Sequence, residues 1–186
     1  MNKETTSRTS PITSASVCRL DISSPDFTYL QTARVWVTEP TGLSRIRRCV
    51  LDDGIQCSFI ARSVLDYLQL ELTDQRDLSV TAFKTYPTAP GRRIFVRFNK
   101  RGTRTNASTS LTAFESTHAF SRHPAVPHDI ETLAHTRKQR LAEPPGDSEN
   151  LPVEILIGGD HHWEIVKDTP PLRLSPSVVL LPSTLG

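Results

Sequence analysis

The sequence predicts a mainly β domain with a few short helices. Apolar, strand-like runs recur along the chain, turn-forming residues separate several of them, and helical spacing of apolar residues is confined to short stretches. The strand-like runs are residues 30–37, 45–51, 78–83, 93–98, 109–114, 153–158 and 177–181. This pattern favours a small β fold without internal repeats.

Length and composition indicate one domain with polar flanks. The chain has 186 residues, of which 37% are hydrophobic, enough for one modest core. Residues 1–25 are rich in Ser and Thr, which predicts a disordered N-terminal lead, and residues 26–186 form the domain. Gly186 follows an apolar run without a polar tail, so we expect the chain to be a piece of a longer one.

Charge, cysteine usage and hydropathy argue against several classes of protein. A net charge of +2 does not by itself indicate nucleic-acid binding. The first residues lack the apolar stretch of a secretory signal, and no apolar run approaches the roughly 20 residues that cross a bilayer. Three cysteines without regular spacing form no disulfide framework. We therefore expect an intracellular protein without a membrane partner.

The first half of the domain is predicted from its turns and its spacing. Residues 30–37 and 45–51 should form a hairpin, because residues 39–42 supply turn-forming side chains. The second strand runs directly into Asp52-Asp53-Gly54. Residues 58–70 then show helical spacing, and Ser58 or Ser63 is the expected cap.

The second half continues as strands around an irregular segment. Two strands, 78–83 and 93–98, flank a Pro/Gly loop, and 109–114 completes a meander. The Pro-rich segment 116–150 is predicted to be an insertion that holds one short helix at 130–141. The buried strand 153–158 precedes a short helix at 160–166, and the last strand is 177–181.

The Asp-x-Gly tripeptide at Asp52 is the motif that carries chemistry. An apolar strand ending in Asp-x-Gly places a carboxylate on a rigid loop at a sheet edge. Two facing copies of such a carboxylate share one proton, so that one acts as a base towards water and the other as an acid. Alone, the tripeptide also occurs in ordinary Asp-rich turns. Here it lies between an apolar strand and an amphipathic segment, and an Ile-Leu-Ile-Gly strand follows about a hundred residues later.

Three segments resemble the aspartic peptidase domain of Pao/BEL-type retrotransposon polyproteins, a relative of the retropepsins. Arg48 to Ile60 (Arg-Cys-Val-Leu-Asp-Asp-Gly-Ile-Gln-Cys-Ser-Phe-Ile) resembles the family's Leu-Leu-Asp-Ser-Gly-Ser-Gln-x-Ser-Phe-Ile. Val153 to Trp163 (Val-Glu-Ile-Leu-Ile-Gly-Gly-Asp-His-His-Trp) resembles its Ile-Asp-Ile-Leu-Ile-Gly-Ala-Asp-Tyr-Tyr-Trp. The run from Leu174 to Gly186 resembles the segment that follows, although the Trp that usually ends it is absent.

The resemblance implies a single-lobe retropepsin-like acid protease barrel with short helices. Asp52 matches the catalytic aspartate, Asp53 and Gly54 match the rest of its loop, and Ile157 and Gly158 match the step that supports the loop. The hairpin between residues 78 and 98 falls where a flap would close over substrate. The implied activity is that of an aspartic endopeptidase working as a homodimer, each chain giving one Asp52.

The implied substrate is a polypeptide, in particular the polyprotein that the retrotransposon encodes. No cofactor and no metal is implied, and nucleic acid is not an expected partner. The implied location is the cytoplasm or the retroelement particle.

Departures from the family's pattern leave other functions open. Asp53 replaces the usual Ser or Thr, Ile55 replaces a frequent polar residue, and Lys84 stands where glycine is common. One alternative is therefore a non-catalytic retropepsin-like module for dimerisation or binding. Another is an RNA-binding accessory domain that uses the basic run between Arg92 and Arg104, although a solvated strand face explains that run more simply.

The remaining side chains have structural interpretations. Adjacent histidines such as His161 and His162 point to different sides, so we expect no zinc site. No histidine is placed by motif to activate Cys57, so a cysteine nucleophile is not expected. Trp36 and Trp163 are predicted to be core residues.

Overall fold

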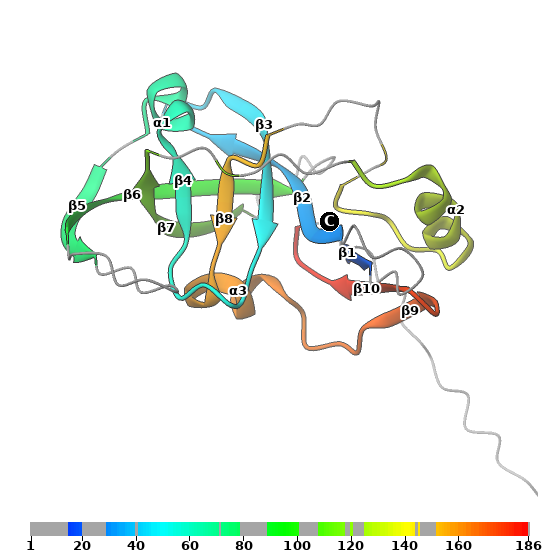
Figure 1. The fold of residues 1–186 in the computed structure, drawn as a ribbon. Coiled ribbons are helices and arrows are strands. Elements are labelled where there is room, and N and C mark those ends of the chain that lie inside the picture. Colours follow the sequence, from blue (N-terminus) through cyan, green and yellow to red (C-terminus); the bar gives the residue numbers. More distant parts are fainter. Residues whose placement is uncertain are drawn as a thin grey trace, which may run out of the picture.

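The structure is a computed structural model of the chain. It describes residues 15–19, 29–39, 41–70, 72–78, 89–100, 108–117, 120, 125–143, 145 and 152–185. Within these ranges strands predominate and the helices are short (Figure 1). The predicted mainly β class is confirmed.

The strands of the described residues are β1 (Ala15–Arg19), β2 (Tyr29–Thr38), β3 (Ser44–Leu51), β4 (Phe59–Ala61), β5 (Leu72–Leu78), β6 (Ala89–Lys100), β7 (Ser108–Ser116), β8 (Ile155–Ile157), β9 (Leu172–Ser175) and β10 (Val178–Pro182). The helices are α1 (Arg62–Leu68), α2 (His128–Thr136) and α3 (Gly159–Ile165).

Six of the described strands close into a barrel. The order β6-β7-β4-β8-β3-β2 runs around it, and β6 also pairs with β2, which closes the ring. The remaining strands extend the sheet beyond the ring: β5 pairs with β6, while β1, β10 and β9 continue outwards from β2. A closed ring leaves its member strands without a free edge at the closure, which protects them from pairing with other chains.

The β2–β3 hairpin forms as the sequence predicts. Ala33, Val35 and Val37 are fully buried and alternate with half-buried neighbours, as a strand with one core face requires. β3 pairs with β2 over its whole length in antiparallel register. The turn between them uses Gly42 with φ of 95°, a left-handed conformation that favours glycine.

Strand β8 occupies the centre of the barrel wall between β3 and β4. It runs parallel to β3 and antiparallel to β4. Ile155 and Ile157 are fully buried, and they belong to the same apolar cluster as Cys49 and Leu51 of β3 and Ile60 of β4. The apolar run predicted at 153–158 is thus a short central strand.

The Pro-rich segment 116–150 is attached to the fold through its described residues. Ile130 and Ala134 of α2, with Val126 and Leu141, form a second apolar cluster with Leu174, Val178 and Leu180 of β9 and β10. The helix predicted at 130–141 is present as α2, but it begins at His128 and ends at Thr136. The described part of the segment therefore packs on the sheet extension rather than standing free.

The helix predicted at 58–70 begins later than expected. Residues 59–61 form β4, which pairs with both β7 and β8, and the helix covers only Arg62–Leu68. Its N-cap is Ala61, without a side-chain capping bond, so the prediction of Ser58 or Ser63 as the cap is wrong. Helical spacing placed Phe59 and Ile60 in the helix, but strand pairing across the barrel determines their conformation.

Other predictions at the ends of the fold need correction. Ala15–Arg19, expected in the disordered lead of residues 1–25, form β1, which pairs with β10 and β2. β5 at Leu72–Leu78 and β9 at Leu172–Ser175 were not predicted as strands. The rest of the lead and residues 79–88 lie outside the described residues, and these include all of the strand predicted at 78–83 except Leu78.

Trp163 differs from its predicted place in the core. Its side chain on α3 is 73% exposed, whereas the neighbouring His162 is buried and contacts it edge-on at 5.0 Å between ring centroids. Trp36 on β2 is half-buried.

None of the helices in the described ranges is long and apolar enough to span a lipid bilayer.

Candidate active site

The loop from Asp52 to Ser58 joins β3 to β4, the two strands that flank β8. In Figure 1 it lies at the lower edge of the barrel beside α3, while α1 lies at the upper edge. Both ends of the loop leave strands of the central wall, so both ends are fixed by hydrogen-bonded pairing to β8. A loop held in this way presents its side chains from a rigid base.

Asp52 is bound to the wall and to its own loop. Its backbone N–H donates to the carbonyl of Ile157 at 2.9 Å, which extends the β3–β8 pairing by one step. Its carboxylate Oδ1 accepts the backbone N–H of Gly54 at 3.0 Å. The side chain is half-buried.

Gly54 leaves room for the Asp52 carboxylate. A Cβ at position 54 would lie 3.2 Å from Asp52 Oδ1, closer than an ordinary contact. The glycine therefore lets its N–H approach the carboxylate without steric opposition. Asp53 is exposed.

Ile157 and Gly158 lie directly against the loop. Ile157 is fully buried, and a Cβ at Gly158 would lie 2.7 Å from backbone atoms of Cys57 and Ile55. The φ of Gly158 is −88°, so the position requires glycine for space and not for an unusual backbone conformation. Gly159 adds a 2.7 Å hydrogen bond from its N–H to the carbonyl of Ile55. The structure thus brings Asp52, Gly54, Ile157 and Gly158 into one set of contacts.

A side-chain network that the sequence did not predict closes the far end of the loop. The carboxylate of Asp160 accepts the backbone N–H of Ser58 at 3.0 Å and its hydroxyl at 2.7 Å. Ser58 Oγ in turn accepts the N–H of Gly158 at 3.0 Å. The available sequence signal was the Gly-Gly-Asp that follows the buried strand, but Ser58 lies 102 residues away in the chain.

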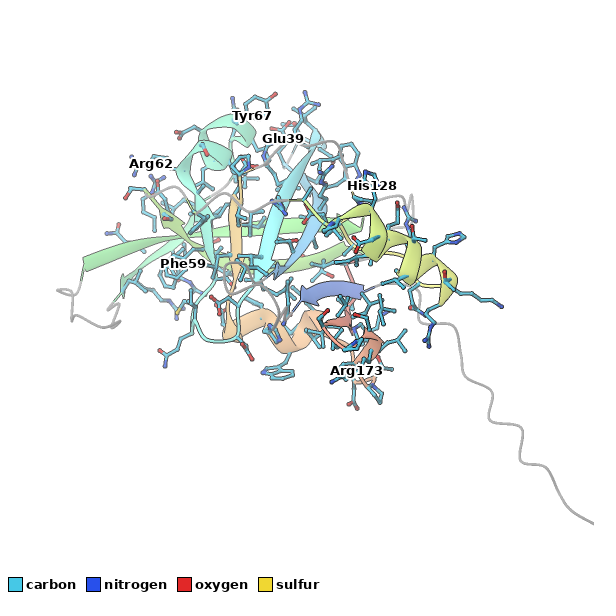
Figure 2. All side chains as sticks on the ribbon, turned by 45° about the vertical axis from the view of Figure 1, so that its right-hand side comes forward. Glu39, Phe59, Arg62, Tyr67, His128 and Arg173 are labelled. Atoms are coloured by element: carbon cyan, nitrogen blue, oxygen red, sulfur yellow. The ribbon has the colours of Figure 1, made fainter. Side chains whose placement is uncertain are left out.

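Two aromatic side chains and one arginine lie on the strands next to the loop. Phe59, labelled in Figure 2, opens β4. Its ring centroid lies 6.1 Å from that of Phe114 of β7. The guanidinium of Arg93 lies 5.7 Å from the centroid of Phe114. These side chains come from strands on the loop's β4 side.

The cysteines near the site are disfavoured as thiolates. Burial raises the pKa of the Cys57 thiol and the charge of Asp160 raises it further, while Arg93 lowers it. Complete burial raises the pKa of Cys49 to about 12. A nucleophilic cysteine needs the opposite shift.

Histidines on α3 serve structural contacts. His161 Nε2 accepts the N–H of Thr112 at 3.3 Å, and its Nδ1 lies 3.1 Å from Glu164 Oε2. His162 is buried. Within the described part of the chain, no three His, Cys, Asp or Glu side chains gather as a metal-binding group.

The two arginines that open the basic run of β6 are engaged in ion pairs. Arg92 Nη1 lies 3.1 Å from Glu115 Oε2, and Arg93 Nη1 lies 3.3 Å from Asp74 Oδ2. Arg62 of α1 also pairs with Glu115 at 2.5 Å. These contacts leave the run with less free positive charge than the sequence suggests.

The candidate site consists of one half-buried carboxylate, that of Asp52, on a loop that β8 and the start of α3 support. Asp-x-Gly occurs once in the sequence, so one chain supplies one such carboxylate. No protein-family model, no curated protein and no solved structure matches this chain.

Proposed function

We propose that the protein is a retropepsin-like aspartic endopeptidase that works as a homodimer, with Asp52 of each chain in the active site. The observation that carries the proposal is the loop from Asp52 to Ser58, anchored on both sides of β8, in which Asp52 Oδ1 accepts the N–H of Gly54. This arrangement fixes one carboxylate oxygen, and in the proposed dimer the other one faces the substrate.

The proposed reaction needs two such carboxylates. When two Asp52 side chains face each other about 3 Å apart, they share one proton, because both cannot ionise comfortably at that distance. The ionised member removes a proton from a water held between them, and the protonated member donates to the carbonyl oxygen of the peptide bond. The N–H of Gly54 steadies the inner oxygen of each pair member.

A second chain is part of the proposal because each chain holds one Asp-x-Gly. A two-fold arrangement supplies the second carboxylate from an identical surface. The proposed substrate is a polypeptide, and the resemblance to Pao/BEL peptidases favours the polyprotein that such a retrotransposon encodes. The chemistry requires neither a metal nor a covalent intermediate.

Asp53 supports a second candidate, a non-catalytic module of the same fold that dimerises or binds. Its exposed carboxylate follows Asp52 directly, so a two-fold pair would bring four carboxylates close together. Like charges at short range oppose one another unless protons or cations neutralise them. This candidate predicts self-association without cleavage.

A peptidase assay with one isosteric variant tests the proposal. The purified chain is incubated with a peptide library at acidic to neutral pH, and cleavage is measured by mass spectrometry. Asp52→Asn keeps the shape of the side chain but removes the acid–base function, so kcat should fall on the order of a thousandfold or more.

The matched control is Asp66→Asn, because Asp66 is exposed on α1 at the opposite end of the barrel (Figure 1). Its cleavage rate should equal that of the unmodified chain. Cleavage that survives Asp52→Asn, or its complete absence in the unmodified chain, contradicts the peptidase. A dimer that never cleaves supports the binding module instead.

A further inference from the structure

The loop that carries Asp52 is attached to α3 through one buried hydroxyl and one carboxylate. Ser58 is fully buried, and its hydroxyl lies between the N–H of Gly158 and the carboxylate of Asp160. The second carboxylate oxygen of Asp160 accepts the N–H of Ser58. Both oxygens are therefore used, and both end on the same loop residue.

Backbone bonds complete this attachment. The N–H of Asp160 donates to the carbonyl of Gln56 at 3.1 Å, one step along from the bond between Gly159 and Ile55. The loop's second half is thus bound residue by residue to the start of α3. Its first half is bound to β8 through Asp52 and Ile157.

We infer that Asp160 is a positioning residue for Asp52, acting through Ser58. This inference rests on the proposed peptidase function for its catalytic consequence. Asp160 would contact neither the substrate nor the attacking water; it holds the end of the loop so that the Asp52 carboxylate keeps its direction. A shift of about 1 Å in a reacting group can lower a rate about a hundredfold, which is the scale of effect expected here.

The chemistry of the pair makes the inference testable with small changes. Asp160→Asn has nearly the same shape, but its amide oxygen is the single acceptor for two donors, and its nitrogen is itself a donor. The amide nitrogen cannot accept from the Ser58 hydroxyl, so this bond is either lost or reversed, with the neutral amide as the donor, and the carboxylate's charge is removed from the linkage. Ser58→Ala removes the hydroxyl and leaves the N–H of Gly158 without its acceptor.

Kinetics provide the first measurement. For Asp160→Asn, kcat should fall about a hundredfold while KM stays within about twofold, because substrate binding does not involve the carboxylate. The double variant with Ser58→Ala should be no slower than the slower single variant, since both changes break one linkage. Asp168→Asn and Ser63→Ala are matched controls at exposed positions and should leave kcat unchanged.

Amide hydrogen exchange provides a measurement that does not depend on activity. The N–H of Gly54 is bonded to Asp52 Oδ1, so its exchange rate reports on the carboxylate directly. In Asp160→Asn the amides of Gly54, Ser58 and Gly158 should exchange faster, while those of the β2–β3 pairing keep their rates. If Asp160→Asn unfolds the whole domain, Ser58→Ala is measured in its place.

The two measurements separate the possible failures. An unmodified chain that never cleaves overturns the proposed function, and the positioning role then stands or falls with the exchange at Gly54. Unchanged exchange at Gly54 in both variants, or unchanged kcat in an active Asp160→Asn enzyme, overturns the inference.

Discussion

Two neighbouring glycines show how specific the support of the loop is. A Cβ at Gly158 would lie 2.7 Å from backbone atoms of the loop, whereas a Cβ at Gly159 would find its nearest atom, Ile55 O, at 3.5 Å. The first distance cannot be accommodated without moving backbone, and the second is an ordinary contact. Space, rather than backbone conformation, selects glycine at position 158.

Gly158→Ala should therefore destabilise the domain and displace the loop. Overpacking against backbone costs about 1–3 kcal/mol, and here the displaced atoms belong to the loop that carries Asp52. Gly159→Ala is the matched control and should change the free energy of unfolding by less than about 0.5 kcal/mol. Urea unfolding of both variants measures the difference. Equal stability of the two variants contradicts this account of Gly158.

Glu154, just before β8, gives a pH dependence of stability. Burial raises the pKa of its carboxyl, and Arg47, 3.4 Å away, lowers it in part. Because the folded-state pKa is raised, the fold binds this proton more tightly than the unfolded chain does. The contribution to stability is present below the unfolded pKa of about 4.3 and is lost as the pH rises through the folded value.

Glu154→Gln removes that loss. Relative to the unmodified chain, the variant should gain stability as the pH is raised from about 4 to about 7. Unfolding by urea at several pH values gives the comparison, and Glu131→Gln, at an exposed position of α2, is the control. A difference that is constant across this range, or that shrinks with pH, contradicts the assignment.

At the scale of single residues, the sequence indicated Asp52 and Gly54 but not Ser58 and Asp160. The tripeptide is local, and its glycine and carboxylate interact within two residues. Ser58 was interpreted as a helix cap because apolar spacing continued through Phe59 and Ile60. The partner that explains it, Asp160, is distant in the chain, and no local pattern connects the two.

At the scale of elements, the hairpin and the central strand were predictable, while the outer strands were not. The β2–β3 pair has alternation and a turn signal, and β8 has an unbroken apolar run between polar residues. β1 and β9 both pair with β10, so each depends on a partner that sequence periodicity does not identify. β4 is three residues long and takes its conformation from β7 and β8.

The segment 116–150 is joined to the barrel by a buried ion pair. Arg48 Nε of β3 lies 2.8 Å and 3.0 Å from the two carboxylate oxygens of Glu143, and both side chains are about 1% exposed. Arg34 Nε of β2 lies 3.6 Å from the same carboxylate. Removing the Glu143 carboxylate takes away the counter-charge that it supplies to Arg48 and Arg34, and breaking a buried pair in this way is strongly destabilising.

Glu143→Ala should lower the free energy of unfolding by about 3–5 kcal/mol. Glu131→Ala, at an exposed position of α2, should have an effect of less than about 0.5 kcal/mol. Chemical denaturation followed by circular dichroism gives both values. If Glu143→Ala is as mild as its control, the segment is not held to the barrel by this pair.

At the scale of the whole molecule, the closed barrel puts one braced carboxylate at one end and leaves α1 at the other. A single carboxylate cannot act as base and acid at once in peptide hydrolysis. Two carboxylates related by a two-fold axis can share one proton and divide these roles. We therefore expect activity only from a pair of chains, and its loss when either Asp52 is replaced.

Mixing the unmodified chain with Asp52→Asn, after unfolding and joint refolding at constant total concentration, tests this claim most directly. If every active unit needs two intact Asp52 side chains, activity falls with the square of the unmodified fraction, to about a quarter at equal amounts. Activity that falls in direct proportion, to about a half at equal amounts, would mean that one chain acts alone and would contradict the paired-aspartate account.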